Sequence, residues 1–154
     1  MIQIVHAATQ EQIGNVRELF VEYAHSLNVD LCFENLEKEM NELPGVYAPP
    51  YGSLLLAADG KKIAGCVVLK KIDDRVCEMK RLYVRAEFRG KGIGKKLALR
   101  IADDARKIGY ERLRLDTLPS MKEAISLYRS LGFEEIPAYR DLPVSGALFV
   151  QVTL

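Results

Sequence analysis

Three closely spaced glycines lie among basic residues near the middle of the chain: Gly90, Gly92 and Gly94. Glycine allows the backbone to approach a ligand closely and to adopt positive φ angles. The apolar spacing that follows predicts a helix starting near Ile93, and the first turn of a helix has unpaired N–H groups at the positive end of its dipole. Three cationic side chains flank this turn: Arg89, Lys91 and Lys95. The segment therefore predicts a binding site for a phosphate or pyrophosphate group.

Two well-known phosphate loops do not fit this segment. A Walker loop needs a glycine five residues before the glycine of its Gly-Lys pair, and Ser or Thr after the lysine. For Gly94-Lys95 these positions are Arg89 and Lys96. The dinucleotide pattern GxGxxG, begun at Gly90, ends on Lys95 instead of glycine. A strand-to-helix turn without a ligand would explain one glycine, but three glycines beside these cations favour a binding site of another kind.

Hydrophobic periodicity predicts the elements that position this turn. Apolar residues recur at helical spacing over residues 10–26, and again at Leu36, Met40 and Leu43 in a shorter helix that Pro44-Gly45 ends. Runs rich in β-formers predict four strands before the glycine turn, at residues 2–6, 53–58, 63–70 and 75–84. The Asp59-Gly60 pair suits a tight hairpin between the second and the third of these strands.

The second half of the chain continues the alternation of helices and strands. One apolar stripe predicts a long helix after the glycine turn: Ile93, Leu97, Ile101, Ala105 and Ile108. Gly109 is placed to end this helix. A strand around Leu113 and Leu115 and a short helix ended by Gly132 follow, before two final strands at residues 133–139 and 147–154. The order β-α-α-β-β-β-α-β-α-β-β predicts an α/β (α+β) fold over residues 1–154, one domain with a mixed sheet of about seven strands and four helices.

The composition excludes several classes of function. Of the 154 residues, 49% are hydrophobic and 28% charged, which is typical of a globular domain with a substantial core. The net charge of +1 gives no sign of a nucleic-acid partner, and no apolar run is long enough to span a membrane. The three cysteines form no disulfide pattern, and Cys66 and Cys77 lie in apolar strand sequence, which favours buried thiols and a cytoplasmic protein. With two histidines and no CxxC, we expect no metal site.

Two segments together resemble a known family. The spacing Arg89-x-x-Gly92-x-Gly94 resembles the [RQ]xxGxG/A signature of the GNAT acetyltransferases, which holds the pyrophosphate of coenzyme A. Residues 124–133 resemble the second conserved block of that family, A-x-x-L-Y-x-x-x-G-F, and residues 81–84 resemble the end of its fourth strand. The resemblance covers nearly the whole chain in the order of the family. It implies the GNAT fold and an N-acetyltransferase that uses acetyl-CoA.

The resemblance also implies which residues hold the donor. In the family, the backbone at the end of the fourth strand binds the acetyl carbonyl and the pantetheine amides. The implied coenzyme A contacts are therefore Leu82, Tyr83, Val84, Arg89, Gly90, Lys91, Gly92, Ile93, Gly94 and Lys95. One position departs from the family, since Met121 stands where an asparagine often contacts the pantetheine arm. Ser120 or a backbone group is the expected replacement.

Two residues are candidates for the chemistry. Tyr128 stands at the position of the family's general-acid tyrosine, and its phenol suits protonation of a leaving thiolate; the alternative is a core tyrosine on a helix face. Glu78 lies in a strand with core-like character, where a carboxylate is costly unless it is paired or hydrated. It matches the glutamate that acts as general base in the histone acetyltransferase branch, and the alternative is an ion pair with Lys80 or Arg81. Without a bulge, strand alternation places Glu78, Lys80, Leu82 and Val84 on one face.

The implied reaction is direct attack of a primary amine on acetyl-CoA in a ternary complex, without an acyl-enzyme. We expect the acceptor to be a small molecule, and Lys80, Arg81 or Arg140 could receive a carboxylate that it carries. The alternative for these three cations is that they only form surface ion pairs. Acetylation of a protein N-terminus or lysine, and a non-catalytic module that binds coenzyme A, are the alternatives. Residues 26–51 and 139–146 are expected to determine the acceptor, and a homodimer is implied by the family alone.

Overall fold

The computed structural model describes residues 1–27, 31–140 and 146–154. The elements follow the predicted order: β1 (Ile2–His6), α1 (Gln10–Leu27), α2 (Leu31–Glu42), β2 (Ser53–Asp59), β3 (Lys62–Lys71), β4 (Val76–Val84), α3 (Ile93–Ile108), β5 (Arg112–Thr117), α4 (Lys122–Ser130), β6 (Glu134–Ile136) and β7 (Leu148–Thr153). Two short 3₁₀ turns, Gly45–Tyr47 and Ala86–Phe88, precede β2 and α3. The predicted mixed sheet with four helices is confirmed in the described part of the chain.

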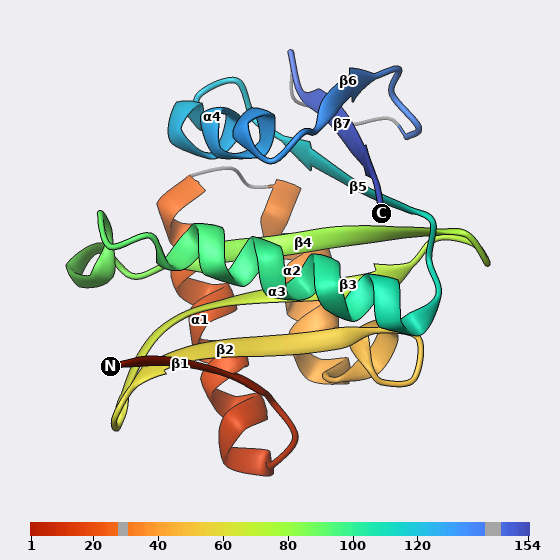
Figure 1. The fold of residues 1–154 in the computed structure, drawn as a ribbon. Coiled ribbons are helices and arrows are strands. Elements are labelled where there is room, and N and C mark those ends of the chain that lie inside the picture. Colours follow the sequence, from red (N-terminus) through yellow and green to blue (C-terminus); the bar gives the residue numbers. More distant parts are fainter. Residues whose placement is uncertain (28–30, 141–145) are drawn as a thin grey trace.

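The strands form one seven-stranded sheet in the order β1-β2-β3-β4-β5-β7-β6. Neighbouring strands are antiparallel except β4 and β5, which run parallel over three residue pairs. A parallel pair needs a crossover connection, and α3 provides it. Figure 1 shows α3 lying across one face of β2, β3 and β4, with α1 and α2 behind the same strands.

Two apolar clusters form the core, one on each face of the sheet. The cluster under α3 joins its apolar stripe to inward residues of β3 and β4, such as Val67 and Met79. The cluster under α1 and α2 joins Phe20 of α1 to Leu56 and Val68 from the opposite faces of the same strands. Each central strand therefore contributes alternate residues to two cores, as expected of a sheet covered on both sides.

Helix α3 begins and ends at glycines, as the sequence predicts. Gly92 precedes the helix with a φ of +76°, and Gly109 follows it with a φ of +114°. The N–H of Gly109 bonds to the carbonyls of Ala105 and Arg106, which caps the last turn. Cys66 and Cys77 are both buried free thiols, as the sequence indicated.

Two sequence predictions are wrong in detail. The strand expected at residues 133–139 is only Glu134–Ile136, because Pro137 has no N–H to continue the ladder. In β4, a bulge interrupts the alternation, since Lys80 pairs with Val68 but Tyr83 pairs with Cys66. Arg81, with a φ of +57°, lies within this bulge.

Because of the bulge, the side chains of β4 after Arg81 point to the opposite faces of the sheet from those that simple alternation would give. Leu82 and Val84 pack on the cluster under α3, while Tyr83 packs on the cluster under α1 and α2. Cys77 and Met79, before the bulge, also belong to the cluster under α3, so the intervening Glu78 faces the other side. Glu78 and Lys80 therefore do not share a face with Leu82 and Val84, and the single-face prediction is corrected.

Candidate active site

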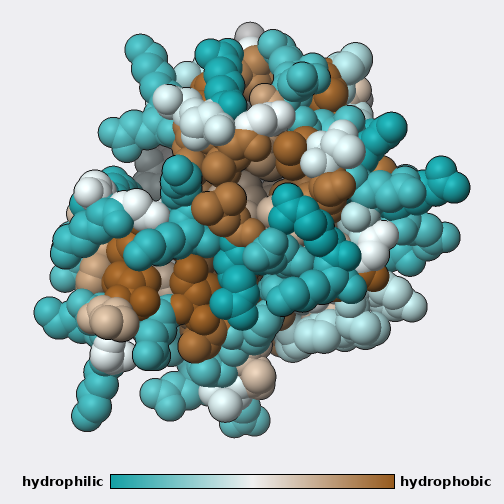
Figure 2. Space-filling model, in the orientation of Figure 1, coloured by the Kyte–Doolittle hydropathy of each residue, from teal (hydrophilic) through white to brown (hydrophobic). Residues whose placement is uncertain are grey.

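The parallel strands β4 and β5 separate in the middle of the sheet. Their last residue pair is Glu78 with Arg114, after which β5 turns away toward α4 (Figure 1). A cavity of about 600 Å³ lies beside the diverging end of β4. It is bordered by the end of β4, the start of α3, α4 and two residues of α1, and apolar side chains are exposed between α3 and α4 on the face shown in Figure 2.

The glycine turn forms one wall of this cavity. Gly90 and Gly92 have φ angles of +80° and +76°, and a Cβ at either position would meet no atom within 4 Å. The space beside the turn is therefore open, while the first N–H groups of α3 point out of the helix without an intrahelical partner. Arg89 is anchored beside the cavity, because its Nε donates a hydrogen bond of 3.0 Å to the carbonyl of Val84.

Most of the residues expected to contact coenzyme A line this cavity: Leu82, Tyr83, Val84, Arg89, Gly90, Gly92, Ile93 and Gly94. Lys91 and Lys95 do not line it and are exposed beside it. Ser120 and Met121 also line the wall, and the hydroxyl of Thr117 contacts the sulfur of Met121 at 3.8 Å. An apolar thioether thus lies where the family often has an amide.

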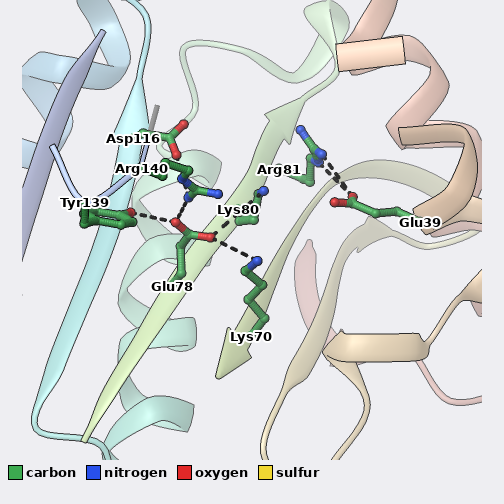
Figure 3. A network of polar contacts seen from close by, with 8 residues as sticks. All are labelled: Glu39, Lys70, Glu78, Lys80, Arg81, Asp116, Tyr139 and Arg140. Atoms are coloured by element: carbon green, nitrogen blue, oxygen red, sulfur yellow. Dashed lines mark hydrogen bonds and ion pairs between the residues drawn. The ribbon is translucent and has the colours of Figure 1, made fainter. Parts of the chain in front are cut away.

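Glu78 lies at the fork between the two strands and is only 1% exposed. Figure 3 shows the polar side chains that converge on it from three segments of the chain. The hydroxyl of Tyr139 donates a hydrogen bond of 2.6 Å to Oε2, and the guanidinium of Arg140 forms an ion pair with the same oxygen. Oε1 lies 3.7 Å from the Nζ of Lys70 and 4.0 Å from the Nζ of Lys80.

Tyr128 lies on the inner face of α4 and is 6% exposed. Its ring packs against Phe133, with 5.7 Å between ring centroids. Burial raises the pKa of its phenol, and the nearby Tyr23 and Asp116 act in the same direction. The side chain borders a smaller cavity next to Thr117, while its neighbours Ala124 and Leu127 line the large one. Burial therefore holds the phenol protonated, and the Tyr128 side chain itself does not line the large cavity.

Comparison with known proteins decides the family. A sequence model described as the acetyltransferase (GNAT) family matches residues 15–133. The chain belongs to this family. An uncharacterized N-acetyltransferase of Schizosaccharomyces pombe is 33% identical and aligns over 99% of this chain and 95% of its own length. The N-acetylaspartate synthetase of Danio rerio is 30% identical over 80% of this chain and 45% of its own length.

The solved structures agree with the family in fold. The N-acetyltransferase PaiA of Thermoplasma acidophilum, crystallised in complex with coenzyme A, is 21% identical to this GNAT enzyme. The two superpose with a TM-score of 0.76, over all of this chain and 99% of the other. The predicted fold, family and enzyme class are thus confirmed: the chain is an acyltransferase that uses acetyl-CoA.

The cavity of this GNAT enzyme has the features that coenzyme A requires. The diphosphate of coenzyme A needs hydrogen-bond donors and space. The N–H groups at the start of α3 can donate, and the open side of Gly90 and Gly92 leaves the space. Among the described residues, no group of His, Cys, Asp and Glu side chains is arranged to hold a metal. Within the same residues, no helix is long and apolar enough to cross a membrane.

Positive charge is concentrated on the Glu78 side of the fork. Burial lowers the pKa values of Lys70, Lys80 and Arg140, and the repulsion of neighbouring cations lowers those of the two lysines further. Arg140 bridges to a second carboxylate, with 2.7 Å between its Nη2 and Oδ2 of Asp116. Burial raises the pKa of Asp116, although the lysines oppose that shift.

Arg81 makes a separate pair at the edge of this cluster. Its Nη2 donates a hydrogen bond of 3.0 Å to Oε2 of Glu39 in α2. The sequence alternative of an ion pair between Glu78 and Arg81 is therefore not observed, whereas the Glu78–Lys80 contact is. Tyr47 lies close to this pair, and burial, followed by the charge of Glu39, raises the pKa of its phenol.

Sequence reasoning gave no specific role to four members of the cluster: Glu39, Lys70, Asp116 and Tyr139. Glu39 and Tyr139 do lie within the ranges 26–51 and 139–146 that were expected to determine the acceptor, of which residues 28–30 and 141–145 lie outside the described residues. Asp116 had a usable signal, because a charged residue near the carboxyl end of a parallel strand commonly lies in a site. Lys70 and Glu39 looked like ordinary polar residues at the ends of a strand and a helix. Tyr139 lay in a segment expected to be a strand, and nothing in the sequence links it to a residue 61 positions away.

Proposed function

We propose that this GNAT enzyme transfers the acetyl group of acetyl-CoA to the primary amine of a small molecule that carries a carboxylate. The observation that carries the proposal is the excess of positive charge beside the fork. Three cations, Lys70, Lys80 and Arg140, share two carboxylates, Glu78 and Asp116. A partly buried cluster with a surplus cation is favourable when an anion of the ligand compensates it.

The similarity to N-acetylaspartate synthetase supports the same class of acceptor. That relative is named for an acetylated amino acid, whose precursor joins an amine and carboxylates in one small molecule. The alignment covers 80% of this chain and includes the fork and the glycine turn within its span of 128 residues. Amino acids are therefore the first acceptors to test.

In the proposed mechanism, the glycine turn and Arg89 hold the diphosphate of the donor, and the backbone of Leu82 to Val84 receives its acetyl and pantetheine groups. Acetyl-CoA supplies a thioester, whose acetyl group moves to the attacking amine in a ternary complex. Glu78 accepts the proton of the amine, directly or through water. Tyr128 donates a proton to the departing sulfur, and its raised pKa keeps that proton available across the working pH range.

Proteins are the competing acceptors. A protein N-terminus or lysine would also bring a primary amine, but it would not bring a carboxylate next to that amine. We also expect the enzyme to work in the cytoplasm, where free thiols such as Cys66 and Cys77 persist. A homodimer remains an expectation drawn from the family.

The experiment is an acceptor screen with detection of the thiol released from acetyl-CoA. The panel pairs each free amino acid with its amide, which keeps the amine and removes the negative charge, and adds polyamines and peptides with a free N-terminus or lysine. We expect free amino acids to react and their amides to react far more slowly. Faster acetylation of peptides than of every amino acid and polyamine would refute the small-molecule acceptor. Equal rates for the amino acids and their amides would refute the proposal that the cations bind a carboxylate of the acceptor.

A further inference from the structure

We propose that Tyr139 is a positioning residue that anchors Oε2 of Glu78, so that Oε1 is the oxygen that accepts the proton of the acceptor amine. The inference rests on the proposed function, in which Glu78 is the base. It assigns different tasks to the two oxygens of one carboxylate. It also gives a specific task to Tyr139, the first residue of the 139–146 range that was expected only to determine the acceptor.

Oε2 of Glu78 is held by two neighbouring residues of the segment after β6. The hydroxyl of Tyr139 donates to it at 2.6 Å, and Arg140 forms an ion pair with it. Arg140 is itself fixed by Asp116 on β5, at 2.7 Å. The oxygen is thus engaged by a neutral donor and a cation, and a proton placed on it would have to displace both.

Oε1 is in a different state. It is buried, and within the described part of the chain it makes no hydrogen bond. The nearest cationic nitrogens, of Lys70 and Lys80, are 3.7 and 4.0 Å away, beyond the normal length of a hydrogen bond. An unpaired buried acceptor is costly in a native protein. An N–H group of the incoming amine would satisfy it, and the proton that the amine loses would then pass to Oε1.

Tyr139 is itself held firmly enough to fix the carboxylate. Its ring packs edge-to-face on Phe149 of β7, with 5.0 Å between centroids. The guanidinium groups of Arg114 and Arg140 lie over the same ring at 5.3 and 5.2 Å. The ring therefore ties Glu78 on β4 to the far half of the sheet across the fork (Figure 3).

Loss of the Tyr139 hydroxyl has a predictable sign. A hydrogen bond donated to a carboxylate favours its charged form, so its removal makes Glu78 easier to protonate. The other charged groups around Glu78 stay in place. Lys70, Lys80 and Arg140 pair with its carboxylate, Asp116 pairs with Arg140, and Arg114 is its neighbour on β5. The pair of Glu39 and Arg81 at the edge of the cluster is also unchanged. A change in the pKa of Glu78 in Tyr139→Phe therefore reports the loss of this one hydrogen bond.

The experiment measures kcat against pH for Tyr139→Phe at saturating acetyl-CoA and acceptor, since kcat reports the groups of the ternary complex. We expect the acid limb to move up by about one pH unit, which lowers kcat about tenfold on that limb. Acetyl-CoA affinity, measured by calorimetry, is expected to stay unchanged. The matched control is Tyr110→Phe, because Tyr110 is also buried and its hydroxyl donates a 2.7 Å hydrogen bond to the carbonyl of Tyr51, away from the fork.

The outcomes separate the inference from the proposed function. If Tyr139→Phe lowers only the melting temperature, as Tyr110→Phe does, and leaves the acid limb in place, Tyr139 has no positioning role. Glu78→Gln identifies the limb itself. If that limb persists in Glu78→Gln, Glu78 is not the base, and the proposed function loses that residue. If Glu78→Gln removes the limb and Tyr139→Phe does not move it, only the inference fails.

Discussion

Glu78 and Arg114 are the last residues through which β4 and β5 pair. One step further along the chain the two strands diverge, so the buried carboxylate lies where the sheet opens. Beyond that point, no strand in the described part of the chain pairs with β4 on this side, and the end of β4 borders the cavity next to the glycine turn. The fork thus places a titratable group on the same strand as the residues that border this cavity, four positions before Leu82.

Gly92→Val should prevent acetyl-CoA from binding. Valine at a φ of +76° strains the backbone by about 1–2 kcal/mol, and its side chain would extend into the open space proposed for the diphosphate. Calorimetry with acetyl-CoA measures the effect. The matched control is Gly60→Val in the β2–β3 hairpin, since Gly60 also has a positive φ and no atom within 4 Å of a Cβ. Normal acetyl-CoA affinity in a folded Gly92→Val protein would show that the glycine turn does not bind the diphosphate.

Arg89→Ala should weaken acetyl-CoA binding about tenfold at low salt, the loss expected for one charge-assisted contact. The difference from the unmodified enzyme should shrink as salt rises, because the screening length falls from about 10 Å at 0.1 M to about 3 Å at 1 M. Titrations at both salt concentrations measure this. The control is Arg106→Ala at the other end of α3. It also removes an exposed guanidinium, in this case one that pairs with Asp103. A salt-independent loss for Arg89→Ala would indicate a structural role instead.

Tyr128→Phe should lower kcat by about 10²–10⁴-fold with little change in acetyl-CoA affinity. The substitution removes only the hydroxyl and keeps the ring packed on Phe133. Since burial raises the pKa of Tyr128, the phenol stays protonated up to high pH, and the unmodified enzyme should show no loss of rate from this group below about pH 10. Initial rates and melting temperatures test both points. Near-normal kcat at every pH would make Tyr128 a core residue only.

Glu78→Gln should reduce the rate most at low and neutral pH, where the acceptor amine is protonated and needs a base. At high pH the free amine is abundant, so the deficit should narrow. The melting temperature should also fall, because Arg140 and Lys70 lose a carboxylate in a buried position. Rates are therefore compared at temperatures where both proteins are folded. A deficit that is uniform in pH would argue for a structural contribution of Glu78 alone.

Cys66 and Cys77 should resist alkylation in the folded enzyme. Burial raises the pKa of each thiol to about 12, so the reactive thiolate is lost as the pH falls below that value. At pH 8 only about one thiol in ten thousand is ionised, and access is blocked as well. Peptide mass spectrometry after iodoacetamide treatment should find both unmodified, with full modification in urea. Inactivation that tracks labelling of either residue would contradict attack by the amine without an acyl-enzyme.

The order of elements and the glycine turn could be predicted because their signals are local. The stripe from Ile93 to Ile108 and the glycines at both ends specify α3 almost to the residue. The bulge was not predictable in the same way. Arg81 is an ordinary strand residue by type, and its positive φ depends on the pairing of β4 with β3 rather than on its own preference.

The ionic cluster shows the same limit. Glu78 was a candidate because a carboxylate in a core-like strand is unusual, but its partners come from β3, β5 and the segment after β6. No periodic pattern connects Tyr139 or Asp116 to it. Only the three-dimensional sheet brings them together, so their contribution was found in the structure and not in the sequence.

The bulge at Arg81 has a consequence for how two substrates reach one strand. Glu78 and Lys80 face the side of the sheet covered by α2, whereas Leu82 and Val84 face the side covered by α3. Acceptor and donor would then enter by separate routes, from opposite sides of the same backbone, and neither blocks the other. We expect initial-rate plots with intersecting lines and no compulsory order of addition.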